Sequence, residues 1–184
     1  MTWVSLKSAY FKYIILTAPE QVDKVCKKIM KLFNITTILL FFFPLYFYSQ
    51  NIARVIGIKD GDTILVLDQN NNQTTLRLAE VDCPEKGQPF GKNAKQFTSD
   101  LIYGKRIQYY KINSDQYGRI IAKVYYDNKY LSEEIIKSGF GWWYFKYSNN
   151  KKLGLLETKA KMLKRGLWSD HNPISPWTFR TLNK

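Results

Sequence analysis

Short runs of alternating apolar and polar residues recur along the chain from residue 53 onward. The first three runs predict a meander of three strands, because turn-forming residues separate them. Two later runs predict a fourth and a fifth strand on either side of a polar stretch at 113–118. The five predicted strands cover residues 53–58 (ARVIGI), 63–68 (TILVLD), 74–81 (TTLRLAEV), 106–112 (RIQYYKI) and 119–126 (RIIAKVYY).

Three further segments are predicted to be helices, at 92–102, 131–138 and 151–164. Each is followed within two residues by a glycine, which commonly ends a helix. Five short strands with a helix between the third and the fourth match the layout of an OB-fold barrel. The sequence therefore predicts a mainly β, α+β fold: a five-stranded OB-fold barrel with about three helices.

The amino-terminal third has a different composition. Residues 38–48 (ILLFFFPLYFY) carry no charge, the lysines at 24, 27, 28 and 31 lie just upstream, and polar residues follow at 49–51. A basic flank, a short apolar run and a polar exit are typical of a secretory signal peptide. The wider stretch 32–48 is shorter than the roughly 20 residues that a spanning helix needs. A signal anchor and a buried apolar helix are the alternatives.

The place of this apolar run also predicts how the chain is organised. Signal peptides begin at the first methionine, but here 37 residues precede the apolar run. We therefore expect that residues 1–29 are either a mis-called start, with translation beginning at Met30, or an unusually long basic region of the signal peptide. We predict a leader over 1–50, a folded domain over 51–170 and a tail over 171–184. This implies a secreted or periplasmic protein, or one anchored in the membrane with its domain outside the cytoplasm.

Charge and composition narrow the class of protein. The 184 residues suffice for one domain of ordinary size, and 45% apolar content excludes a wholly disordered chain. The net charge of +13, of which residues 51–184 contribute +9, favours a polyanionic partner, either nucleic acid or a membrane surface. Two cysteines exclude a disulfide-dense scaffold, and the single histidine excludes a multi-histidine zinc site.

Four local patterns contain the candidate chemistry. They are DGDT at 60–63, Arg77 with Asp82-Cys83-Pro84-Glu85 (DCPE), DQYGR at 115–119, and GLWS at 166–169. Each alone is weak, since a DG dipeptide also forms ordinary turns. Together, in this order and spacing, they resemble the thermonuclease family of staphylococcal nuclease-like domains. The resemblance extends from about residue 54 to 168.

The resemblance implies a set of catalytic residues, and their chemistry agrees with it. Asp62 and Asp82 would bind Ca²⁺ through hard oxygen atoms, with the backbone carbonyl of Cys83 as a third protein ligand. Glu85 would be the general base that activates water. Arg77 and Arg119 would neutralise the charge that develops on the phosphoryl oxygens. Pairing with a neighbouring acid is the structural alternative for each arginine.

Aromatic residues are expected to contact the nucleotide. The resemblance places Tyr117 and Tyr147 at positions of substrate-binding tyrosines, and Tyr144 would replace a tyrosine that is missing at Phe145. Stacking on such rings tolerates any base. The neighbouring pair Trp142-Trp143 has an alternative role in the core. Trp177 in the tail is expected to pack back on the domain, and the lone His171 is expected to be a surface or packing residue.

One geometric condition follows from the spacing of Arg77 and Asp82. Residues five apart on a regular strand point to opposite faces of the sheet. A shared site therefore requires a bend or bulge near residues 79–81.

These observations predict a calcium-dependent nuclease that hydrolyses phosphodiester bonds of DNA and RNA, expected to be a monomer. A non-catalytic nucleic-acid-binding or protein-binding module on the same barrel is the main alternative. A tethered protein whose basic helix meets anionic lipid is a third. The retained acids argue against a pure binder, because three carboxylates repel phosphate unless a metal ion intervenes.

Overall fold

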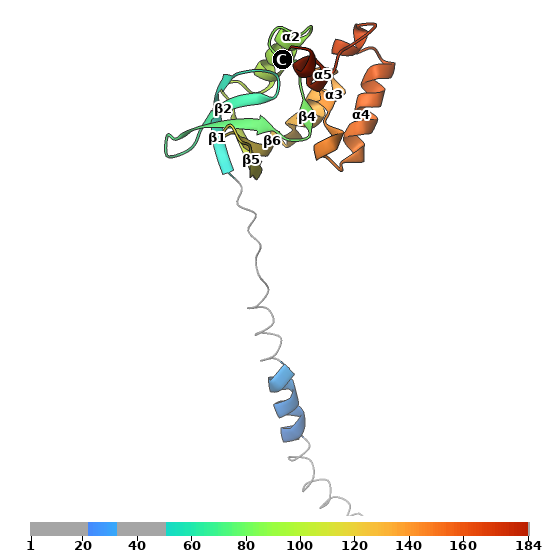
Figure 1. Cartoon of the computed structure of the whole chain (residues 1–184). Coiled ribbons are helices and arrows are strands. Elements are labelled where there is room, and N and C mark those ends of the chain that lie inside the picture. Colours follow the sequence, from blue (N-terminus) through green and yellow to red (C-terminus); the bar gives the residue numbers. More distant parts are fainter. Residues whose placement is uncertain (1–21, 33–50, 184) are drawn as a thin grey trace, which may run out of the picture. The chain divides into compact units, whose positions relative to one another are not determined.

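The computed structural model describes residues 22–32 and 51–183 (Figure 1). A helix at 22–32 belongs to a unit of residues 1–47, and all other described elements belong to a unit of residues 48–184. The predicted apolar run at 32–48 lies outside the described residues, apart from Leu32. Within the described part, no helix is both long and apolar enough to cross a membrane.

Five strands form a closed barrel, as predicted (Figure 1). Neighbouring strands follow the order β3-β2-β1-β5-β6 in antiparallel pairs. A parallel pairing of β3 with β6, in register at Arg77 and Ile121, closes the barrel. The bounds of the strands are β1 Asn51–Ile58, β2 Thr63–Leu67, β3 Gln73–Leu78, β5 Arg106–Ser114 and β6 Ile120–Tyr126, with a short β7 at Lys129–Tyr130.

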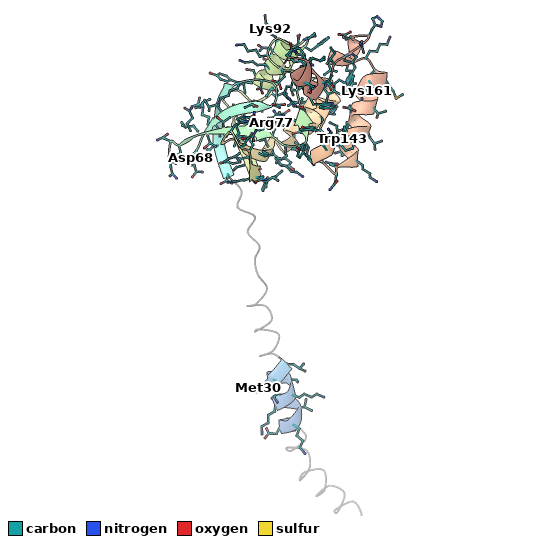
Figure 2. The ribbon with its side chains drawn as sticks, in the orientation of Figure 1. Met30, Asp68, Arg77, Lys92, Trp143 and Lys161 are labelled. Atoms are coloured by element: carbon teal, nitrogen blue, oxygen red, sulfur yellow. The ribbon has the colours of Figure 1, made fainter. Side chains whose placement is uncertain are left out.

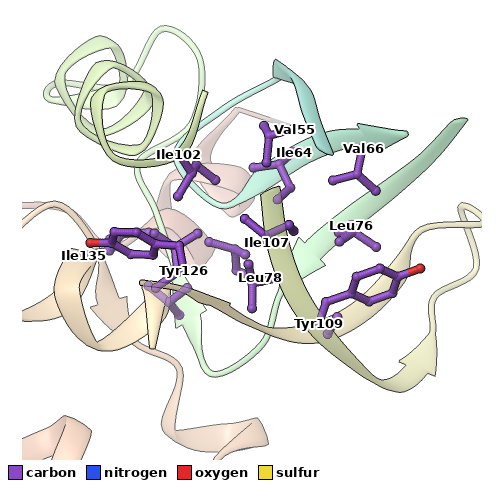
Figure 3. Packing of buried hydrophobic residues seen from close by; sticks show 14 of the residues in the cluster. Val55, Ile64, Val66, Leu76, Leu78, Ile102, Ile107, Tyr109, Tyr126 and Ile135 are labelled. Carbon is purple, nitrogen blue, oxygen red and sulfur yellow. The ribbon is translucent and has the colours of Figure 1, made fainter. Parts of the chain in front are cut away.

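Strand alternation fills the barrel with aliphatic side chains. Ile64, Leu76 and Ile107, which come from three different strands, are each at most 1% exposed and lie together in Figure 3. Both tryptophans of the pair Trp142-Trp143 are half-buried and pack against the core: Trp143 packs against the main core, and Trp142 packs against Trp168. The core role considered for this pair is thus confirmed for both.

Within the unit of residues 48–184, the α-helices follow the prediction with one addition. The three expected helices are α2 at Gly91–Ile102, α3 at Leu131–Lys137 and α4 at Lys151–Met162. A fourth, α5 at Pro176–Leu182, lies in the tail and was not predicted. The Ser175 side chain caps it by accepting from the Thr178 N–H, and Pro176 begins it, a combination common at helix starts. Two short 3₁₀ helices are η1 at Phe145–Tyr147 and η2 at Gly166–Ser169.

The third predicted strand is divided in two, and this is the bend that a shared site requires. Strand β3 ends at Leu78, and β4, Val81–Asp82, pairs separately with β8, Trp142–Trp143. Between them Glu80 has a positive φ of 68°. Side chains hold this turn: the carboxylate of Glu80 accepts from Tyr130 and Ser148 at 2.9 Å each. The bend predicted near residues 79–81 is therefore confirmed.

The end of α3 depends on a glycine in two independent ways. Gly139 has a φ of 76°, and a Cβ placed there would lie 2.2 Å from the backbone oxygen of Arg165. Gly104 has a similar φ of 74° but no heavy atom within 4 Å of such a Cβ. An alanine at either position would therefore strain the backbone, and it would also be crowded by neighbouring atoms at position 139 but not at position 104.

We expect Gly139→Ala to lower the free energy of unfolding by at least about 1 kcal/mol more than Gly104→Ala, because overpacking adds to the backbone strain. Urea denaturation of the two variants measures the difference. Equal losses would contradict the close approach between Gly139 and Arg165.

Candidate active site

Two buried carboxylates and one arginine form the centre of the site. Asp62 directly precedes β2 and is 2% exposed, while Asp82 ends β4 and is completely buried. Arg77 of β3 lies between them, in the middle of the domain in Figure 2. Its Nη1 donates to Asp62 Oδ1, and its Nη2 donates to Asp82 Oδ1 at 2.6 Å. The structure thus brings these three predicted residues into direct contact.

The DGDT segment is shaped so that Asp62 faces inward. Asp60 makes the turn, because its Oδ1 accepts from the Asp62 N–H at 3.2 Å. At Gly61 an added Cβ would lie 2.7 Å from the Cβ of Cys83, so only glycine allows this close approach. Thr98 of α2 donates to the Gly61 carbonyl at 2.7 Å and fixes the loop. The turn role considered for this pair of aspartates therefore applies to Asp60, whereas Asp62 belongs to the site.

Burial controls the electrostatics of this centre. It raises the pKa of Asp62 to about 6, although the charge of Arg77 acts in the opposite direction. Burial opposes the charged form of Arg77 as well, but the charges of Asp62 and Asp82 outweigh it and raise the pKa of the guanidinium. Arg77 therefore stays charged and compensates two acids that water does not reach.

Cys83 contributes its backbone and not its thiol. Burial raises the pKa of the thiol well above its ordinary value, with further contributions from Asp62 and Asp82, so the side chain stays neutral. A neutral buried thiol is a poor nucleophile. The backbone N–H donates to Asp62 Oδ2 at 2.7 Å and orients that carboxylate. The ligand role of the Cys83 carbonyl stays a prediction, and the N–H contact to Asp62 is an additional role of the same backbone.

Glu85 is connected to Asp82 through the guanidinium of Arg180, at the edge of the buried centre. Its side chain is 35% exposed, and its N–H donates to the side chain of Gln88 at 3.0 Å. Its carboxylate accepts from Arg180 Nη1, and Arg180 Nη2 donates to Asp82 Oδ2 at 2.7 Å. The tail, to which the sequence assigned no function, therefore supplies a residue of the site.

Arg119 approaches the centre from the turn between β5 and β6. Its Nε donates to Asp115 at 2.7 Å, which is the acid pairing considered as the alternative for this arginine. Its Nη1 also lies 3.5 Å from Thr63 Oγ1, and that hydroxyl donates to Asp62 at 3.1 Å. Arg119 is thus connected to Asp62 through the hydroxyl of Thr63 and makes no direct contact with the three acids at the centre of the site, Asp62, Asp82 and Glu85. Tyr117 lies close to its guanidinium, 5.7 Å from the ring centroid, and is 76% exposed.

The other predicted aromatics lie on the segment after β8. Tyr144 is near the acids, since burial and then the charge of Asp82 raise the pKa of its hydroxyl. Its ring lies 4.8 Å from that of Tyr147 and stacks on Trp177 with centroids 5.7 Å apart. Tyr147 is 74% exposed. As predicted, Trp177 packs back on the domain, and His171 is exposed.

Asp62 and Asp82 offer oxygen atoms of the kind that Ca²⁺ binds in proteins. In the part of the chain that the structure describes, no group of three or more His, Cys, Asp or Glu side chains could hold a metal. Asp62 and Asp82 converge on one guanidinium, however, so two hard carboxylates share a site that already holds a positive charge. Ca²⁺ accepts such oxygens together with backbone carbonyls and waters. The two carboxylates are therefore donors of the kind that fits Ca²⁺, and Cys83 directly follows Asp82 in the sequence.

Comparison with known proteins gives a consistent result. A family model described as staphylococcal nuclease homologue matches residues 75–170. An uncharacterized endonuclease of Haemophilus influenzae is 38% identical over 152 residues, which cover 82% of this chain and 85% of the relative. An uncharacterized endonuclease of Escherichia coli is 36% identical, covering 70% of this chain and 84% of the relative. A micrococcal nuclease of Shigella flexneri is 34% identical, with coverage of 72% and 82%.

Proposed function

The chain belongs to the staphylococcal nuclease homologue family and is a phosphodiester hydrolase, and from this premise we propose that it is a calcium-dependent nuclease of DNA and RNA. One observation carries the proposal: Arg77 bridges the buried Asp62 and Asp82, and Arg180 links Asp82 to Glu85. Two buried acids and a charged arginine form a costly arrangement for stability alone. Such arrangements are typical of catalytic sites.

We propose Asp62, Asp82 and the carbonyl of Cys83 as the Ca²⁺ ligands. The ion would supply positive charge to a phosphate oxygen and make nearby water more acidic. Asp82 and Cys83 are adjacent in sequence, and the Cys83 N–H donates to Asp62 Oδ2 at 2.7 Å, so the three residues belong to one hydrogen-bonded cluster. Asp62 directly precedes β2 and Asp82 ends β4, so the fold fixes their backbones, while their side-chain oxygens are paired with Arg77 and Arg180.

Glu85 is the proposed general base. It would take a proton from the attacking water, whose oxygen forms a bond to phosphorus while the bond to the 5′ oxygen breaks, and the leaving 5′ oxygen would take up a proton from solvent water. Its partial exposure, 35% of the side chain, leaves room for substrate and water. Arg77 and Arg119 would donate to the phosphoryl oxygens, where the planar guanidinium matches the developing charge. The products would be a 3′-phosphate and a 5′-hydroxyl.

Exposed tyrosines and positive charge support binding of the polynucleotide. Tyr117 and Tyr147 are each about three-quarters exposed, which suits stacking with bases. Tyr144 contacts the ring of Tyr147, the charge of Asp82 helps to raise the pKa of its hydroxyl, and it would contact the nucleotide nearest the cleaved bond. The net charge of +9 on residues 51–184 favours any nucleic acid regardless of sequence. We therefore propose DNA and RNA as substrates for a monomeric enzyme.

Analysis of the product ends tests this proposal. The purified full chain would be incubated with plasmid DNA and with single-stranded RNA in Ca²⁺. We expect both to be cut internally, leaving 3′-phosphate ends that block polymerase extension until a phosphatase removes them. Fragments with 3′-hydroxyl ends, or release of single nucleotides without internal cleavage, would contradict the proposed reaction.

The place of action is proposed from the leader alone. The apolar run at 32–48 behind a basic flank supports secretion or export to the periplasm, with a membrane tether through the same run as the alternative. Fractionation of cells expressing the full chain, followed by N-terminal sequencing, separates these outcomes. Retention in the cytoplasm would overturn both.

A further inference from the structure

Arg180 makes the most extensive contact with the acids of any residue outside the predicted site. It lies on α5, 98 residues after Asp82 in sequence. Its Nη2 donates to Asp82 Oδ2 at 2.7 Å, and its Nη1 lies 3.3 Å from Asp82 Oδ1 and also donates to Glu85. One guanidinium therefore spans a proposed Ca²⁺ ligand and the proposed general base.

The two oxygens of Asp82 have different closest partners. Oδ1 accepts from Arg77 Nη2 at 2.6 Å, while Oδ2 accepts from Arg180 Nη2 at 2.7 Å. Among the contacts of the described residues, the carboxylate of Glu85 has Arg180 as its one partner. Arg180 thus covers the Asp82 oxygen that Arg77 leaves free, and no water reaches Asp82, which is completely buried.

The docking of α5 on the rest of the domain sets the position of Arg180. The ring of Trp177 stacks on Tyr144 with an interplanar angle of 5° and packs edge-on against Trp142. Just before the helix, the carbonyl of Ile174 accepts from Gln88 Nε2 at 2.6 Å. Gln88 also accepts from the N–H of Glu85, so one side chain connects the tail to the proposed base.

We infer that Arg180 is a residue of the metal site that sets its affinity for Ca²⁺: its guanidinium holds Asp82 Oδ2 and Glu85, and Ca²⁺ displaces it from Asp82. This inference rests on the proposed function. Three carboxylates and two guanidiniums leave the centre with one negative charge. Removal of Arg180 makes the centre more negative by one charge and frees one buried oxygen.

Both changes act in the same direction on cation binding. A ligand that must displace an existing partner loses the free energy of that contact, so the apparent affinity rises when the partner is removed. Dissolved salt screens the contact between Arg180 and Asp82 only weakly, because the carboxylate of Asp82 is buried. The side chain of Arg180 is itself 39% exposed, so it has space to leave Asp82 toward solvent.

Calorimetric titration of the metal-free full chain with Ca²⁺ tests the inference. We expect Arg180→Met, which keeps the apolar stem, to bind Ca²⁺ about 5- to 150-fold more tightly than the wild type. Arg180→Gln should shift the affinity in the same direction, and Arg180→Lys should shift it less. Arg54→Met is the matched control, because Arg54 is an exposed arginine on β1 and its loss changes the net charge equally.

Each outcome has a defined meaning. An unchanged or weaker affinity in both neutral variants, each shown to be folded by circular dichroism, would overturn the inference and leave Arg180 as a structural ion pair. An equal gain in Arg54→Met would also overturn it, because the effect would then be one of net charge. Asp82→Asn separates this from the proposed function: if the wild type and this variant bind Ca²⁺ equally, or neither binds it, the proposed site itself fails.

Discussion

Glu85→Gln is expected to lower the rate of DNA hydrolysis by about 10²- to 10⁴-fold, the usual contribution of a positioned general base. The amide cannot accept the proton of the attacking water, yet it has nearly the same size as the carboxylate. Glu85 is partly exposed and accepts from Arg180 alone among the described residues, so the substitution removes no buried contact of the core. Initial rates on plasmid DNA at saturating Ca²⁺ measure the loss.

Glu133→Gln is the matched control for this variant. Glu133 pairs with Lys152 on the helical side of the domain and has no contact with the acids of the site. We expect its rate to equal that of the wild type. A loss of less than about tenfold for Glu85→Gln at full Ca²⁺ occupancy would assign the base to another group.

Arg77→Met is expected to lower the free energy of unfolding of the metal-free chain by about 3–5 kcal/mol. The variant leaves Asp62 without a cationic partner and Asp82 with only Arg180, and both carboxylates are buried. Ca²⁺ binds the folded state and compensates the same acids, so it should restore part of the loss. Urea denaturation with Ca²⁺ and with a chelator measures both effects.

Arg106→Met, on the exposed side of β5, serves as the control and should change stability by less than about 0.5 kcal/mol. If Arg77→Met were as stable as this control in the chelator, the bridge between Asp62 and Asp82 would not exist in solution. Loss of stability that Ca²⁺ does not reduce would place the ion elsewhere.

Much of the fold follows from local patterns in the sequence. Alternation predicts the five barrel strands because one face of each strand is buried, and Ile64 and Leu76 illustrate this face. The spacing of Arg77 and Asp82 even predicts a bend, since a regular strand cannot place both side chains in one site. The structure locates that bend at Glu80, where φ is positive.

The rest depends on contacts between segments far apart in sequence. The pairing of β4 with β8 joins residues about 60 apart, and no local pattern specifies it. Helix α5 had a local signal in Ser175 and Pro176, but that signal does not indicate where the helix docks. The contact of Arg180 with Asp82 arises only when α5 packs on the aromatic segment of Tyr144. The order of motifs in the sequence therefore predicts the acids of the site but does not predict Arg180, the second arginine that contacts Asp82.

Removal and return of Ca²⁺ during DNA cleavage tests the proposed reaction most directly. Plasmid DNA would be incubated with the full chain in Ca²⁺, a chelator would be added in excess, and Ca²⁺ would then be restored. We predict that strand breaks accumulate, stop at the chelator and resume with the ion, while Glu85→Gln gives almost none throughout. Breaks that continue in the chelator, or DNA that is bound and stays intact in Ca²⁺, would contradict a calcium-dependent nuclease.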